Sequence, residues 1–129
     1  RKAIAAIDIP VLKLDSGSRE KFEAINCPAD GVDFEKLLEL LVAMENIYVQ
    51  TLLVGGEPSN SEPEDIEAYC RCLKAIRPIE AHIYSIDRPV PDRGLKLVGA
   101  DRLEEIAQKI RRVTGVTVRT FSASWSRAH

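Results

Sequence analysis

Residues that could contact a ligand stand directly after several apolar runs of this sequence. Asp15, the pair Gly55 and Gly56, and Arg88 each occupy such a position. A carboxylate accepts hydrogen bonds from hydroxyl or amine groups, glycines let a ligand approach the backbone, and a guanidinium binds carboxylate or phosphate. Each residue also has a purely structural interpretation, in which Asp15 and the glycines make turns and Arg88 lies in a surface loop. The residues alone leave both interpretations open.

The remaining chemically reactive residues do not form a pattern of their own. His82 has no second histidine or carboxylate at metal-ligand spacing, which favours a hydrogen-bonded strand residue over a ligand or a base. Cys70 lies on the predicted buried side of a helix, Cys72 lies at the flank of that side, and Cys27 precedes a proline in a loop. We therefore predict no metal ligands and no catalytic nucleophile with a partnered base.

Apolar periodicity predicts strands that alternate with helices. The expected strands cover 10–14, 47–54, 81–86 and 116–121. The expected helices cover 18–25, 34–44 after an N-cap at Asp33, a segment from a Ser61–Glu64 capping box to Pro78, and a segment opened by Asp101 and Glu104 that ends at a Gly115 C-cap. No hairpin signal interrupts the series, so right-handed βαβ units and a parallel sheet are expected.

Polar residues alternate with apolar ones along every expected strand. Lys13, Gln50, His82, Tyr84 and Arg119 are the polar members. A parallel sheet covered by helices on both faces should be apolar on both, whereas a barrel around a solvated cavity has room for polar side chains. We therefore predict an α/β fold that is a partial (βα) TIM-like barrel, with about four parallel strands and the helices on its outer face. Ligands should gather where the loops 15–18, 55–60 and 87–94 converge.

Composition limits the classes of protein further. The chain has 129 residues, of which 45% are hydrophobic and 29% charged, as expected for a single globular domain. No apolar run approaches the roughly 20 residues of a membrane-spanning helix. The net charge of −2 gives no overall attraction to nucleic acid or anionic lipid, and three cysteines favour a reducing, cytoplasmic setting.

Four motifs in order resemble the later part of radical S-adenosylmethionine (radical SAM) proteins. They are LKLDSG at 12–17, FEAINCP at 22–28, QTLLVGG at 50–56 with Asn60, and YSIDRPVP at 84–91 with Gly94. The nearest subgroup contains relatives of the wyosine-forming tRNA enzymes and uncharacterised iron-sulfur oxidoreductases. The resemblance implies a partial (βα) barrel and a cofactor set of S-adenosylmethionine with a 4Fe-4S cluster, which a C-x-x-x-C-x-x-C loop ligates.

The sequence departs from that family at specific places. It has no cysteine triplet of this spacing, Cys27 stands where the family has Arg in INRP, and His82 stands where Gln is expected. The resemblance therefore implies residues 1–121 as the carboxyl-terminal half of such a barrel, followed by a polar tail at 122–129. Because the chain begins with Arg1 inside what reads as the end of a helix at 1–6, we expect the first strands and the cluster loop upstream.

Site residues carry over by position in the family motifs. Asp15 is implied as a polar contact facing the cavity, and Gln50 and Thr51 are implied to line the barrel. The segment that contains Leu53, Gly55 and Asn60 corresponds to the stretch whose backbone passes the adenine, and Tyr84 and Arg88 are implied to face ligand or substrate.

Three functions remain open at this point. The chain is either a fragment that cannot cleave S-adenosylmethionine alone, or a stand-alone half-barrel that binds or scaffolds by pairing with itself or with a separate amino-terminal half through exposed sheet edges. A third possibility is a barrel fragment that binds a phosphorylated metabolite through Gly55, Gly56 and Arg88. The sequence specifies neither the substrate nor whether RNA is bound.

Overall fold

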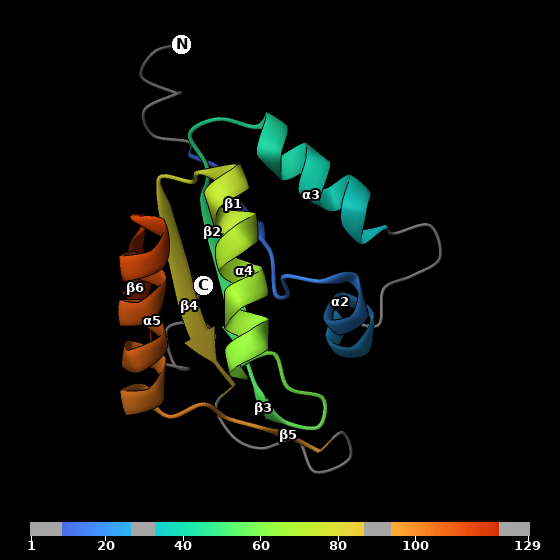
Figure 1. Ribbon diagram of the computed structural model, residues 1–129, viewed down its shortest axis with the longest axis vertical. Coiled ribbons are helices and arrows are strands. Elements are labelled where there is room, and N and C mark those ends of the chain that lie inside the picture. The colour runs from blue at the N-terminus through green and yellow to red at the C-terminus, as the bar shows by residue number, and fades with distance from the viewer. Residues whose placement is uncertain (1–8, 27–32, 87–93, 122–129) are drawn as a thin grey trace.

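The computed structural model describes residues 9–26, 33–86 and 94–121 (Figure 1). The elements in chain order are β1 (Val11–Lys13), α2 (Arg19–Asn26), α3 (Phe34–Ala43), β2 (Tyr48–Leu53), β3 (Gly55–Gly56), α4 (Pro63–Ile76), β4 (Glu80–Ser85), β5 (Leu95–Lys96), α5 (Ala100–Thr114) and β6 (Thr117–Thr120). The expected helix end at 1–6, Cys27, Arg88 and the tail at 122–129 lie outside the described residues.

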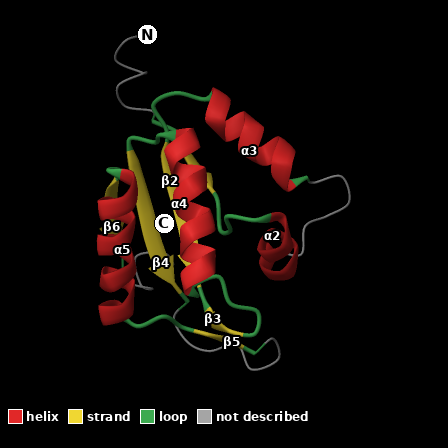
Figure 2. Ribbon diagram, viewed as in Figure 1, coloured by secondary structure: helices red, strands yellow, loops and turns green. Residues whose placement is uncertain are grey.

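Four strands form one parallel sheet in the order β1-β2-β4-β6. Helices α3, α4 and α5 follow β1, β2 and β4 in the chain and return it to the start of the next strand (Figure 2). The prediction of an α/β fold with a parallel sheet flanked by helices is confirmed. This arrangement is compatible with part of a (βα) barrel.

The hydrophobic core lies between one face of the sheet and the helices. Every second strand residue points into it, and so do the predicted apolar sides of α4 and α5. The main contributors are Leu14, Val49, Leu53, Ala81, Ile83 and Val118 from the strand segments, Ile66, Tyr69, Cys70, Leu73 and Ile76 from α4, and Leu103, Ile106, Ala107 and Ile110 from α5. Burial of each large aliphatic side chain contributes about 1.5–3 kcal/mol to folding. No helix in these segments is long and apolar enough to cross a membrane.

The helix ends agree with the sequence in two places and differ in two. Asp33 caps α3 by accepting the Glu35 N–H at 2.9 Å, and Gly115 ends α5 with φ 75°. At α4 the predicted box is wrong by one residue, because the Asp65 carboxylate accepts the N–H of Glu62 at 3.1 Å. The start of α5 also differs, because the helix begins at Ala100 after the N-cap Gly99, one residue before the expected opening at Asp101.

A second, two-stranded sheet was not expected from the sequence. β3 pairs with β5 in an antiparallel manner, so that Gly56 lies opposite Leu95. Figure 1 shows this small sheet beyond the carboxyl ends of β2 and β4. Gly56 has φ +85°, and a Cβ there would lie 2.2 Å from the Gly94 carbonyl oxygen. The glycine is thus required for the pairing of the two strands.

Candidate functional site

Polar side chains form a row across the face of the sheet that points away from the core. Lys13, Gln50, His82 and Arg119 are partners in register on β1, β2, β4 and β6. Each of the four has a neighbour along its strand segment that belongs to the core, so alternation directs these four side chains to the opposite face. We call this side of the sheet the polar face. The predicted alternation of the strands is confirmed for all four.

An ion cluster occupies the amino-terminal half of the polar face. His82 Nε2 lies 2.8 Å from Glu80 Oε1, and Arg119 Nε lies 3.0 Å from the same oxygen. The His82 ring also contacts Tyr48 and Phe121, with ring centroids 5.0 Å and 5.1 Å away. The hydrogen bond from His82 holds the pKa of Glu80 below its ordinary value, and the Arg119 charge adds to this effect. His82 is a hydrogen-bonded strand residue, as expected.

Lys13 connects the polar face to the carboxyl end of β1. Its Nζ lies 3.4 Å from Asp15 Oδ2, and its surroundings include the Tyr84 hydroxyl. Partial burial lowers the pKa of Lys13, but Asp15 and Tyr84 more than offset this and raise it. Asp15, Gln50 and Tyr84, predicted as site residues, therefore lie on three neighbouring strand segments.

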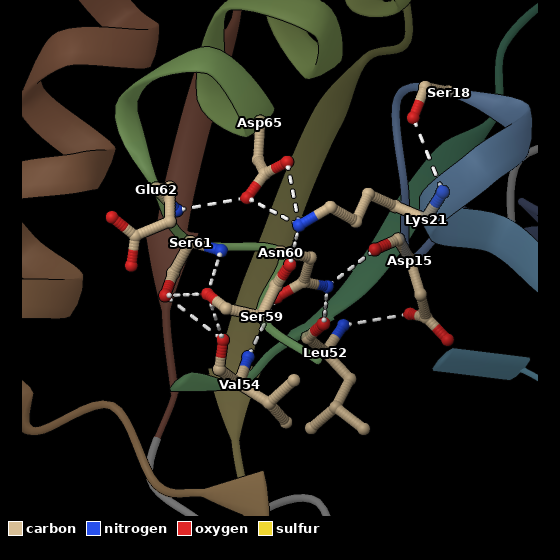
Figure 3. Close-up of polar contacts among 10 residues, drawn as sticks. All are labelled: Asp15, Ser18, Lys21, Leu52, Val54, Ser59, Asn60, Ser61, Glu62 and Asp65. Atoms are coloured by element: carbon tan, nitrogen blue, oxygen red, sulfur yellow. Dashed lines mark hydrogen bonds and ion pairs between the residues drawn. The ribbon is translucent and has the colours of Figure 1, made fainter. Parts of the chain in front are cut away.

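Two side chains replace the backbone ladder where β1 and β2 diverge. Asp15 Oδ1 accepts the Leu52 N–H at 2.8 Å (Figure 3). Asn60 Nδ2 donates to the carbonyl oxygens of Asp15 at 2.6 Å and Leu52 at 2.8 Å, and its Oδ1 accepts the Val54 N–H at 2.8 Å. Asn60 is 3% exposed, so its amide is used within the protein. The structure places Asn60 as a clamp between strand ends.

Lys21 from α2 holds the loop after β2. Its Nζ donates to the Ser59 carbonyl oxygen at 2.5 Å and lies 3.4 Å from the Asp65 carboxylate (Figure 3). Lys21 and Ser59 also line a cleft of about 310 Å³ together with Gly56 and Glu57. Sequence reasoning missed this contact, because nothing local relates a lysine to groups 38 and 44 residues away.

Gly55 and Gly56 differ in what surrounds them. Among the described residues, a Cβ on Gly55 would meet only the Lys96 carbonyl oxygen, at 3.9 Å. Gly56 is fixed by its φ and by Gly94, as described above. The backbone at Gly55 is therefore open to close approach from its Cα side, while one edge of the segment is already paired with β5.

Two residues implied by the family motifs point away from the polar face. Thr51 Oγ1 donates to the Leu14 carbonyl oxygen at 2.8 Å and contacts the Tyr69 hydroxyl of α4 at 2.6 Å. The Leu53 side chain also lies in the core. The prediction that Thr51 lines the barrel beside Gln50 is wrong, because adjacent strand residues face opposite sides of a sheet.

Thiols and metal ligands do not gather in the segments that the structure describes. Cys70 and Cys72 are buried, and burial raises the pKa of both thiols. No group of three or more His, Cys, Asp or Glu residues there could hold a metal ion. These residues do not fit an iron-sulfur cluster, which needs several converging thiolates.

Comparison with known proteins assigns no family. No protein-family model matches the chain, and no curated protein matches it.

Proposed function

We propose that this chain is the carboxyl-terminal part of a radical SAM partial barrel, in which the polar face and the strand-end loops face S-adenosylmethionine and substrate. The observation that carries the proposal is the row of Lys13, Gln50, His82 and Arg119, in register on the face opposite the helices. Buried polar groups are costly without partners, so such a row suits the inside of a barrel that holds water or a ligand.

The strand ends support the same proposal. Ligands of (βα) sheets bind at the carboxyl ends of the strands. Asp15 follows β1, Gly55 follows β2, and Tyr84 lies one residue before the end of β4. The sequence motifs that resemble the radical SAM family contain these same three residues.

S-adenosylmethionine fits this end of the sheet in part. The open backbone at Gly55 allows a flat ring to approach closely, and the Gln50 amide both donates and accepts hydrogen bonds. Asn60 would act indirectly, by fixing the strand ends. S-adenosylmethionine supplies the adenosyl group when it is bound.

The cluster of the family does not fit the residues described. Buried Cys70 and Cys72 are poor thiolate ligands, and the sequence has no C-x-x-x-C-x-x-C motif. We therefore derive no cluster-dependent step, and we do not propose that this chain cleaves S-adenosylmethionine alone.

Calorimetric titration of the chain with S-adenosylmethionine tests the proposal. We expect saturable binding with a Kd below about 1 mM. Gly55→Val should weaken binding at least about tenfold by filling the open space, whereas Gly99→Val, also at an uncrowded glycine, should not. No saturable binding, or equal affinity in the Gly55→Val variant, would contradict the proposal.

The half-barrel module remains a second candidate because of the sheet edges. Among the described strands, β1 and β6 each pair on one side only, and Val11 on β1 is 49% exposed. Such edges are templates for another strand. Light scattering after size-exclusion chromatography distinguishes the two candidates, since the module predicts a dimer at micromolar concentration and a monomer would exclude self-pairing.

A further inference from the structure

Helices α4 and α5 form a groove on the side of the molecule opposite the polar face. The two helices lie next to each other and both run toward the amino-terminal ends of the strands (Figure 1). Between them is a cleft of about 220 Å³ lined by Glu67, Cys70, Arg71, Lys74, Lys109 and Val113.

A second cleft lies at the carboxyl-terminal ends of the two helices and shares Lys74 with the first. It has a volume of about 410 Å³. Arg77, Ile79 and Val116 are among its lining residues. We call the two clefts together the basic groove, defined by its cations Arg71, Lys74, Arg77 and Lys109 and by the apolar residues Ile79 and Val113.

The cations of the basic groove lack acidic partners within the described part of the chain. Cations elsewhere in that part are largely paired: Lys13 with Asp15, Arg19 with Glu35, Lys21 with Asp65, Arg102 with Glu105, Arg111 with Glu104, and Arg119 with Glu80. Arg71, Lys74, Arg77 and Lys109 make no such ion pair there, and Glu67 is the acidic residue at the rim. The groove therefore concentrates positive charge on a chain whose net charge is −2.

The helix dipoles explain the placement of only some of these cations. Lys74 lies in the last turn of α4, where a cation offsets the negative end of the helix. Arg71 and Lys109 lie before the last turns of their helices, where the dipole effect has faded. The helix dipole thus does not explain why cations stand at these two positions.

Apolar surface accompanies the charge. Ile79 and Val113, one in each cleft, are each 41% exposed. An exposed apolar residue bordered by charges is typical of a protein interface, in which an apolar centre has a polar rim.

Other anionic ligands fit less well. Among the described residues that line the clefts there is no aromatic side chain on which a base could stack, which argues against single-stranded nucleic acid. The larger cleft meets the carboxyl-terminal ends of both helices at Arg77 and Gly115, and their negative dipole ends disfavour a bound phosphate.

We propose that the basic groove docks an acidic peptide segment of a partner protein, with carboxylates at Arg71, Lys74 and Lys109 and an aliphatic or aromatic side chain on Val113 and Ile79. This proposal does not depend on the function proposed for the polar face. Charge complementarity of this kind sets partner choice and association rate.

Fluorescence anisotropy with a labelled peptide of alternating glutamate and leucine pairs (EELLEELLEE) tests the proposal. We expect binding that weakens with salt and that falls at least about tenfold in Lys74→Glu/Lys109→Glu. Lys36→Glu/Lys96→Glu is the matched control, because both lysines are exposed and the net charge changes equally. Equal loss in both double variants would mean a general charge effect and would overturn the proposal.

Two further measurements test the proposal with other peptides and with a nucleic acid. Selection from a random displayed peptide library, with Lys74→Glu/Lys109→Glu as the counter-target, should enrich acidic residues next to an aliphatic or aromatic one. Enrichment of sequences without acidic residues would overturn the proposal. The proposal would also be overturned if a ten-nucleotide oligouridine bound more tightly than the peptide and Lys74→Glu/Lys109→Glu abolished the binding of that oligouridine.

Discussion

Gly17 allows the loop after β1 to approach α4 closely. The Gly17→Ala substitution, which adds one methyl group, tests this packing. A Cβ at Gly17 would lie 2.3 Å from the Tyr69 nitrogen, 2.4 Å from the Ala68 carbonyl carbon and 2.7 Å from the Tyr69 Cα. All three obstacles are backbone atoms inside a helix, which cannot move aside as a flexible side chain can. The loop and α4 would have to move apart by roughly 1 Å to bring the added Cβ to an ordinary van der Waals distance from these atoms.

The displacement would disturb further contacts that span the same boundary. The Cys72 thiol donates to the Gly17 carbonyl oxygen at 3.6 Å, and the Tyr69 hydroxyl contacts Thr51. Overpacking of a core costs about 1–3 kcal/mol, and backbone obstacles place Gly17→Ala at the upper end, near 3 kcal/mol. For a chain of this size the midpoint of thermal unfolding should fall by roughly 10 °C.

Urea unfolding followed by circular dichroism measures the free energy of unfolding for Gly17→Ala. Gly55→Ala is the matched control, because its Cβ would meet no described atom closer than 3.9 Å. The control should change the free energy of unfolding by less than about 1 kcal/mol. If the free energy of unfolding of Gly17→Ala lies within about 0.5 kcal/mol of the wild-type value, the close packing of Gly17 against α4 is refuted.

Three other predictions follow from buried polar groups and the ion cluster. Ser16 Oγ is buried without a hydrogen-bond partner among the described residues, so Ser16→Ala should raise the free energy of unfolding by about 1 kcal/mol; a loss of that size in urea unfolding would instead reveal a bound partner. Asn60→Ala leaves backbone groups of both strand ends unpaired and should cost about 3 kcal/mol by the same assay, whereas a cost below about 1 kcal/mol would argue against the clamp. Because the Glu80 pKa is lowered by His82 and Arg119, its stabilisation is present above its ordinary value of 4.5 and is lost as the pH falls through the lowered pKa. The stability difference between wild type and Glu80→Gln should therefore shrink in urea titrations as the pH falls below 4.5, and a constant difference would contradict this assignment.

Regular elements were predictable because their side chains repeat with a clear period. The apolar sides of α4 and α5 and the polar row of the four strands follow directly from spacing. The opposite orientations of Gln50 and Thr51 also follow from the two-residue period of a strand. The resemblance to the family motif placed both residues on the same side, whereas the strand period alone predicts the observed orientation of Thr51.

The irregular contacts could not be predicted, because they join residues far apart in the sequence. The clamp joins Asn60 to Asp15 across 45 positions. The β3–β5 pairing involves two-residue strands, one of them Gly-Gly, with no apolar alternation to detect. The capping box is formed by Glu62 and Asp65 and not by the expected Ser61 and Glu64, because the Ser61 hydroxyl donates to the Val54 carbonyl oxygen at 2.9 Å.

The clamp changes how the implied site residues should be understood. Asn60 and Asp15 form hydrogen bonds to backbone groups at the ends of β1 and β2, so they fix the strand ends in the protein without a ligand. Under the proposed function, Gln50, Gly55 and Tyr84 are the residues that would contact the ligand directly. Variants of Asp15 or Asn60 should thus alter stability as well as binding, whereas variants of Gln50 should alter binding alone.

The coding sequence immediately upstream of the Arg1 codon tests the central proposal most directly. A radical SAM barrel predicts an open frame that encodes strands and helices with a C-x-x-x-C-x-x-C motif after the first strand. An upstream frame without this triplet, or one closed by a stop codon, would contradict the proposal.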